Sequence, residues 1–159
     1  MPETLALGLA QPQEAERIAR MSRELIEAGL PWSWTPARVL RHIQDRHSSV
    51  VVARSARRVA GFALMQFGDE TAHLNLMAVM PAWRRHGCGR RMLEWLFATA
   101  DTAGILRIDL ELRADNTAAK SFYEALGFIA GEVRPHYYSR IEAALCMSKR
   151  LYAPRDPPA

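Results

Sequence analysis

Residues 76–104 constrain the fold most, because they read as a strand, a tight basic glycine loop and a helix. The apolar run 74–79 is typical of a buried strand, and Pro81 cannot continue it. Gly87 and Gly89 form a turn in which the backbone can approach a ligand without an intervening Cβ. Apolar residues then recur at helical spacing up to Gly104, where a C-terminal cap is expected: Met92, Leu93, Leu96, Phe97 and Ala100.

The start of this helix is a predicted anion site. A helix N-terminus presents unpaired N–H groups and the positive end of the helix dipole. Arginines flank it at Arg84, Arg85, Arg90 and Arg91. The loop is not a Walker loop and does not match the dinucleotide-binding G-x-G-x-x-G spacing. A phosphate-binding loop and an ordinary basic surface turn therefore both remain open at this stage.

The rest of the chain alternates between predicted strands and helices. Strands are expected at 4–10, 49–54, 59–67, 71–79, 108–113, 128–133 and 144–151. Four helices are expected: one at 14–28, one that begins at Pro36 with Thr35 as its cap, one from the glycine loop to Gly104, and one from Asp115 or Asn116 to Leu126. The central strand–helix–strand unit predicts a parallel crossover, so the fold class is mixed α/β or α+β.

Length and composition indicate one ordinary globular domain at residues 1–152, with a frayed proline-containing tail at 153–159. A net charge of +4 suits an anionic cofactor and does not indicate dedicated nucleic-acid binding. Two cysteines and no membrane-length apolar run predict a cytoplasmic protein. The five histidines lack metal-ligand spacing, so no metal site is expected.

Two motifs resemble the GNAT superfamily of N-acetyltransferases. The sequence R-R-H-G-C-G at 84–89 follows A-V-M-P and resembles the superfamily's acetyl-CoA signature, and 110–128 resembles the second half of the motif. The resemblance covers roughly residues 14–151. It implies a central mixed sheet of about seven strands and four helices, with a splayed parallel pair at the centre into which acetyl-CoA wedges.

Within the superfamily, the chain is most similar to the bacterial ribosomal-protein alanine N-acetyltransferases. The shared elements are P-W-S at 31–33, the L-E-x-R strand and the pair Tyr137-Tyr138. Many relatives carry an asparagine two residues before the A-V pair, where this chain has Leu76 with Asn75 one residue earlier. A one-residue shift within a strand places the side chain on the opposite face.

The resemblance implies a set of acetyl-CoA-binding residues. They are Met77, Ala78, Val79, Arg84, Arg85, His86, Gly87, Cys88, Gly89, Arg90, Asn116 and Tyr123. In the superfamily the loop amides hold the pyrophosphate of coenzyme A, and the peptide N–H at or near Val79 stabilises the thioester oxygen. Asn116 is either a helix cap alone or a cap that also contacts the pantetheine arm.

Glu111 and Tyr123 are the candidate catalytic residues. Amine acetylation needs a base for the ammonium and an acid for the departing thiolate. The resemblance implies Glu111 as the base, directly or through a water, and Tyr123 as the acid. The alternatives are a solvated polar strand face for Glu111 and a packed ring for Tyr123.

Cys88 lies at a helix start among arginines, which predicts a lowered pKa and a reactive thiol. A covalent acyl-enzyme would then be possible, but no histidine–acid partner appears at motif spacing, so we interpret Cys88 as incidental.

The resemblance implies an enzyme that transfers acetyl directly from acetyl-CoA to a primary amine in a ternary complex. The preferred acceptor is a protein N-terminal α-amine, with a small-molecule amine next. A non-catalytic acetyl-CoA-binding module is the alternative from another class, and it would not need Glu111 or Tyr123. A nucleic-acid binder is a distant third. The expected assembly is a monomer or a homodimer.

Overall fold

A computed structural model describes residues 4–138 and 142–151. The expected tail at 153–159 lies outside this part. In chain order the described elements are β1 (Ala6–Leu9), η1 (Pro12–Glu14), α1 (Ala15–Leu25), α2 (Pro36–Gln44), β2 (Ser48–Ser55), β3 (Arg58–Phe67), β4 (Thr71–Val79), η2 (Pro81–Trp83), α3 (Cys88–Thr102), β5 (Arg107–Arg113), α4 (Thr117–Ala125), β6 (Ile129–Tyr138) and β7 (Glu142–Arg150).

The described strands form one seven-stranded sheet in the order β1-β2-β3-β4-β5-β7-β6. β4 and β5 pair in parallel, and the other described pairs are antiparallel. The crossover through α3 is what makes β4 and β5 parallel. The predicted mixed fold, with about seven strands and four helices, is confirmed for the described residues.

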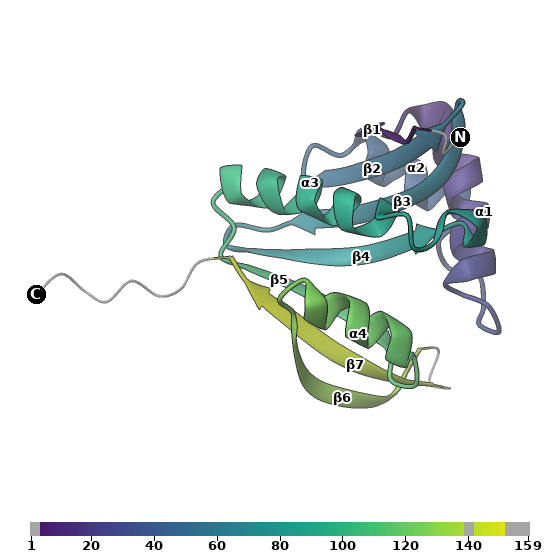
Figure 1. Cartoon of the computed structure of the whole chain (residues 1–159). Helices are drawn as coiled ribbons and strands as arrows, with labels where there is room; N and C mark the ends of the chain where they lie inside the picture. Colours follow the sequence, from purple (N-terminus) through teal and green to yellow (C-terminus); the bar gives the residue numbers. More distant parts are fainter. Residues whose placement is uncertain (1–3, 139–141, 152–159) are drawn as a thin grey trace, which may run out of the picture.

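Helices cover both faces of the sheet, and each face has its own hydrophobic core. α3 and α4 lie over one face, where α3 buries an apolar stripe against the strands: Met92, Leu93, Leu96 and Ala100. α1 and α2 lie over the other face of β2, β3 and β4 (Figure 1), and their buried side chains include Ile18, Met21 and Val39. These stripes are the helical spacings that the sequence predicts.

The central parallel pair separates partway along its length. Paired residues run from Thr71 with Arg107 to Leu74 with Leu110, and β4 then continues to Val79 without further pairing to β5. β7 pairs with β5 from end to end. The two halves of the sheet therefore diverge, as the ribbons in Figure 1 show. This splay confirms the expected arrangement of the central strands.

A β-bulge at Asn75 changes which face of β4 each side chain meets. Leu76 pairs with Leu64, but Leu74 pairs with Met65. Two residues along β4 therefore correspond to one residue along β3. Leu74 consequently packs on the α3 face and Leu76 on the α1 face. A bulge has this effect because it inserts one extra residue into the alternation. The displaced asparagine of the sequence motif is the bulge residue itself.

Two predicted boundaries are wrong. α1 ends at Leu25, three residues before the predicted end at Ala28. The chain turns there, and Glu27 accepts a hydrogen bond from Ser33 N in the following loop. β6 runs to Tyr138, beyond the predicted end at Val133. Pro135 does not end it, because β6 is an edge strand whose pairing with β7 is interrupted around this point.

Candidate active site

Two cavities lie where β4 and β5 separate. The cavity that we call the loop cavity has a volume of about 740 Å³ and is lined by the glycine loop, η2 and α4. The second, the Glu111 cavity, has a volume of about 430 Å³ and is lined by β4, β5 and the end of α1. Both cavities share four lining residues, Met77, Asn116, Ala119 and Tyr123. Two ligands bound in them would meet at these residues.

The loop cavity has the form of an anion cradle. Arg85 and Gly87 have φ angles of 65° and 77°, and this left-handed backbone turns the chain into α3. The first N–H groups of α3 therefore face outward from its start at Cys88. A Cβ placed on Gly87 would meet no atom within 4 Å, so space is open there. Arg84, Arg85 and Arg90 line the cavity. The residues present therefore fit a phosphate-bearing ligand.

The backbone of β4 presents a hydrogen-bond donor to the splay. Met80 N–H donates to Ala60 O at 2.8 Å, and Val79 is paired with Gly61. Alternate residues of an antiparallel ladder direct their N–H groups toward the partner strand. The N–H of Val79 therefore points away from β3, toward the side from which β5 has separated. This orientation matches the oxyanion role that the family resemblance implies.

Glu111 lies on the polar face of β5, opposite the buried face formed by Ile108, Leu110 and Leu112. Its side chain is 15% exposed and lines the Glu111 cavity. Its carboxylate is hydrogen-bonded to His73 Nε2. Its neighbour on the same face, Asp109, is held by Arg107 Nε at 2.9 Å and Ser148 Oγ at 2.8 Å. The charged face of β5 thus borders a cavity, and Glu111 is the β5 carboxylate that lines it; Asp115, in the turn before α4, lines it as well.

Tyr123 stands at the junction of the two cavities. It is 8% exposed, and its ring contacts Phe122 and Phe128 edge-to-face, with centroids 5.2 and 5.5 Å away. The residue has a packing role and also borders both ligand spaces, so the two interpretations from sequence are compatible. Asn116 caps α4, accepting from Ala119 N at 3.1 Å, and lines both cavities.

The loop between α1 and α2 forms one wall of the Glu111 cavity and is held by two charged residues. Buried Glu27 accepts from Ser33 N at 2.9 Å and from the hydroxyl of Ser33. Arg113 Nη2 donates to Ile26 O and Ala28 O at 2.9 and 2.7 Å. Sequence reasoning missed these roles and that of His73. The contacts of Arg113 and His73 join distant segments, and the contact of Glu27 with Ser33 depends on how the loop between α1 and α2 folds back.

Other predicted cofactor residues occupy different surroundings. Met77 and Val79 line the loop cavity. The Ala78 side chain points to the opposite face, into the core formed with α1. His86 is exposed, with its ring against Trp83 at a centroid distance of 5.9 Å. If Ala78 contacts the cofactor, only its backbone is available on the loop side.

The expectation of a reactive Cys88 thiol is wrong. Cys88 is 2% exposed, and a Cβ on Gly61 would lie 3.0 Å from its Sγ, so the thiol packs tightly against β3. Burial raises the pKa of Cys88, and nearby Arg91 opposes this only in part. Desolvation therefore outweighs the helix terminus and the arginines. The thiol is poorly suited to be a nucleophile.

The pKa of His73 is raised by its partner Glu111. Its hydrogen bond with Glu111 raises the pKa of His73 above its ordinary value, although partial burial acts to lower it. The negative charges of Glu111 and Asp109 and the side chain of Asn75 add to the increase. The imidazole therefore stays protonated to higher pH than a free histidine.

A glycine-rich anion cradle on one face of a splayed strand pair, with a carboxylate on the other, defines a protein that brings two ligands together for group transfer. The family model described as "Acetyltransferase (GNAT) family" matches residues 19–128. The chain belongs to this family.

Several relatives are similar over different parts of the chain. The N-alpha-acetyltransferase RimI of Mycobacterium tuberculosis is 31% identical over 140 residues, covering 86% of this chain and 85% of that protein. The ribosomal protein bS18 alanine N-acetyltransferase of Salmonella typhimurium is 42% identical over 81 residues, covering 51% of this chain and 55% of that protein. An uncharacterised Mycobacterium leprae protein, ML0378, is 31% identical over 153 residues, which cover 41% of its length. The chain thus spans about half the length of these last two relatives.

Solved structures share the same fold. The crystal structure of the ribosomal-protein-S18-alanine N-acetyltransferase from Escherichia coli superposes with a TM-score of 0.80 at 25% identity, covering 98% of this chain and 99% of that one. None of the helices in the described part of this chain is long and apolar enough to cross a membrane.

Proposed function

We propose that this protein is an acetyl-CoA-dependent N-acetyltransferase that acts on a protein N-terminal α-amine. The observation that supports it best is the pair of cavities joined at Met77, Asn116, Ala119 and Tyr123. One cavity has the donors for a pyrophosphate and the other has a carboxylate for an amine. Family membership and the names of the relatives agree with this assignment. The cytoplasmic location and the monomeric or dimeric state remain predictions.

Acetyl-CoA would be held in the loop cavity by the N–H groups at the start of α3, with Arg84, Arg85 and Arg90 adding charge. When bound, it supplies the acetyl group as a thioester. The N–H of Val79 would donate to an oxygen on which negative charge develops, and such a fixed donor is a strong source of rate enhancement.

Glu111 and Tyr123 would manage the protons. Glu111 faces the cavity where the amine would bind and takes a proton from it, directly or through a water. Tyr123 borders both cavities, so its hydroxyl is the group we assign to protonate the leaving sulfur. The buried Cys88 does not favour an acyl-enzyme route, which leaves direct transfer in a ternary complex.

A terminal α-amine suits a site whose proposed base is a single carboxylate, Glu111. Such an amine has an ordinary pKa of about 8, against about 10.4 for a lysine side chain. At neutral pH it therefore needs less help to lose its proton. The names of the M. tuberculosis and Salmonella relatives, which specify an N-alpha and an alanine acceptor, point the same way.

The test compares two peptides of identical sequence in a thiol-release assay with acetyl-CoA. One has a free N-terminal alanine and acetylated lysines, and the other has a blocked N-terminus and free lysines. The proposal predicts faster release with the free α-amine. Preference for the lysine peptide or for polyamines would contradict the acceptor. Binding of acetyl-CoA with no turnover on any amine would favour the non-catalytic alternative.

A further inference from the structure

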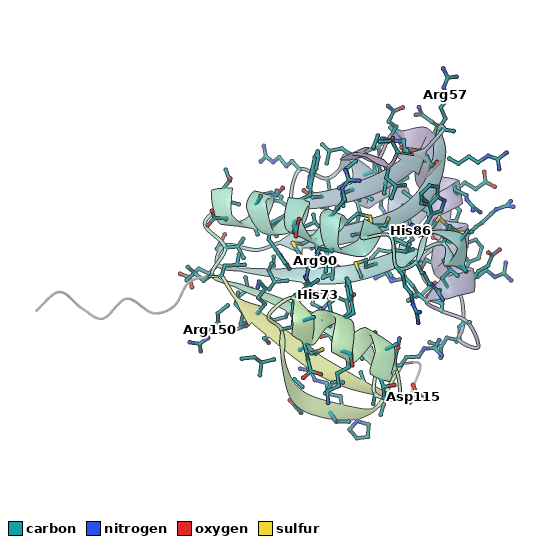
Figure 2. All side chains as sticks on the ribbon, in the orientation of Figure 1. Arg57, His73, His86, Arg90, Asp115 and Arg150 are labelled. Carbon is teal, nitrogen blue, oxygen red and sulfur yellow. The ribbon has the colours of Figure 1, made fainter. Side chains whose placement is uncertain are left out.

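His73 is joined to the candidate base across the parallel strand pair. It lies on β4 two residues before the bulge and is paired in register with Asp109. Its Nε2 contacts Glu111 Oε2, one alternation further along β5. Figure 2 shows His73 between the two halves of the sheet, at the start of the splay. The parallel register of β4 and β5 therefore brings this imidazole to Glu111.

The groups around His73 favour the protonated form of its imidazole. The titratable and polar groups that face it are Glu111 and Asp109 on β5, Asn75 on its own strand, and Gln66, its register partner on β3. The hydrogen bond with Glu111 raises the pKa of His73, and desolvation opposes it. The imidazole therefore stays protonated to higher pH than an unpartnered histidine would.

The proposed reaction has a proton that must leave the site. An ammonium acceptor loses two protons on becoming an acetyl amide, and the departing thiolate takes up one. One proton per turnover therefore goes to solvent. Glu111, at 15% exposure, lies inside the cavity, whereas the His73 side chain is 39% exposed. His73 is thus the more exposed of the two hydrogen-bonded groups.

We propose that His73 is a positioning residue that holds the Glu111 carboxylate and carries its proton out to solvent. This rests on the proposed function. Glu111 takes a proton from the acceptor ammonium, and neutral His73 accepts it at Nε2. The resulting imidazolium releases a proton from Nδ1 to water. Exchange with water then moves the remaining ring proton from Nε2 back to Nδ1, which restores the tautomer that accepts at Nε2. Only bonds to the moving protons change in this relay, and Glu111 returns to the carboxylate form.

The first test uses His73→Gln and His73→Ala, with His47→Ala as a matched control at an exposed histidine. For His73→Gln we expect kcat to fall roughly 10- to 100-fold, below the roughly 10²–10⁴-fold contribution of a group in direct contact with the reacting proton. The Michaelis constant for acetyl-CoA should not change. Added imidazole should restore turnover to His73→Ala. It should not restore turnover to the His73→Ala/Glu111→Gln double variant, which is the control for imidazole acting as a base by itself.

Each outcome decides the proposal. Full kcat in His73→Gln would overturn it. A lowered kcat that imidazole does not restore would show that His73 only supports the structure, and this would also overturn the relay. The pH profile separates the roles further. In the parent, kcat should rise with pH through the pKa of His73, and this limb should disappear in His73→Gln.

A second measurement does not depend on activity or on the Ala variant folding. NMR titration of the His73 imidazole should give a pKa above about 6.5 in the parent protein and a lower one in Glu111→Gln. An unchanged pKa would overturn the coupling. If no amine is acetylated but the coupling is present, the proposed function fails and the His73–Glu111 pair stands. If N-terminal peptides are acetylated and His73→Gln has no effect, only this inference fails.

Discussion

Arg113 Nη2 donates to Ala28 O at 2.7 Å, so a side chain at the end of β5 fixes the loop that follows α1. The same guanidinium donates to Ile26 O at 2.9 Å. Ile26 and Ala28 line the Glu111 cavity together with Arg113 itself. One wall of the acceptor space is therefore set by contacts between segments that are far apart in the sequence.

Replacing Arg113 with Gln should loosen this wall and weaken acceptor binding. We expect the Michaelis constant of the peptide to rise about tenfold, equivalent to about 1.4 kcal/mol and on the scale of one hydrogen bond. The Michaelis constant for acetyl-CoA should stay the same, since Arg113 does not line the loop cavity. Arg20→Gln, which removes an exposed pair with Glu16 on α1, is the control. Equal effects on both substrates would contradict this role.

Substitutions in the glycine loop should weaken acetyl-CoA binding for two different reasons. At Gly87 the φ of 77° strains any other residue, although space is open. At Gly89 a Cβ would lie 3.1 Å from Phe122 Cζ, so a larger side chain pushes into the loop cavity. We expect Gly89→Val to weaken binding severely and Gly89→Ala less so. Calorimetry measures the affinity for acetyl-CoA. A folded Gly89→Val protein with the parental affinity would contradict the binding of acetyl-CoA in the loop cavity.

Tyr123→Phe separates the packing role from the acid role. The ring contacts with Phe122 and Phe128 are kept and only the hydroxyl is lost. We expect kcat to fall by about 10²–10⁴-fold, with little change in the Michaelis constant for acetyl-CoA. Stopped-time thiol release gives both numbers. Parental turnover in this variant would leave Tyr123 with packing alone.

The ion pair between Glu14 and Arg54 should make stability depend on pH. Burial acts to raise the pKa of Glu14, but hydrogen bonds from Arg54 and Gln11 N outweigh it and hold that pKa below its ordinary value. The stabilisation is therefore present above the unfolded-state value of about 4.3 and lost as pH falls through the lower folded value. Glu14→Gln should cost about 1 kcal/mol at pH 7.

Chemical denaturation at several pH values checks this. The gap between the parent and Glu14→Gln should close as the solution is acidified. Glu16→Gln, whose side chain is 65% exposed, should show little cost at any pH. A cost for Glu14→Gln that stays constant down to pH 2 would mean that packing, and not charge, is responsible.

Local patterns predicted most of the fold but not its long-range contacts. The Met92–Leu96 stripe, the Thr35 cap and the alternation of β5 depend on neighbours in sequence, and the structure has them where expected. The register of β4 against β5 and the bulge at Asn75 between β3 and β4 are set by pairing between strands, which no local propensity encodes. The pairing of His73 with Glu111 follows from that register, so sequence alone did not reveal it.

The pKa of the Cys88 thiol also could not be predicted from the neighbouring sequence. Four nearby arginines and a helix start indicated a lowered pKa, yet the side chain packs against Gly61 and is desolvated. Burial depends on how α3 docks on β3, which the loop sequence does not specify. The glycines, by contrast, were informative, because the positive φ at Gly87 is a local requirement.

The pH dependence of Glu111→Gln tests the central claim most directly. The two peptides of identical sequence, one with a free α-amine and one with free lysines, are assayed with acetyl-CoA. At pH 7 the variant should be strongly impaired on the α-amine peptide and should recover as pH rises through the amine's pKa of about 8, because solvent then removes the proton. On the lysine peptide little recovery should appear below about pH 10. Full activity of Glu111→Gln at neutral pH would remove Glu111 from the mechanism and contradict the account.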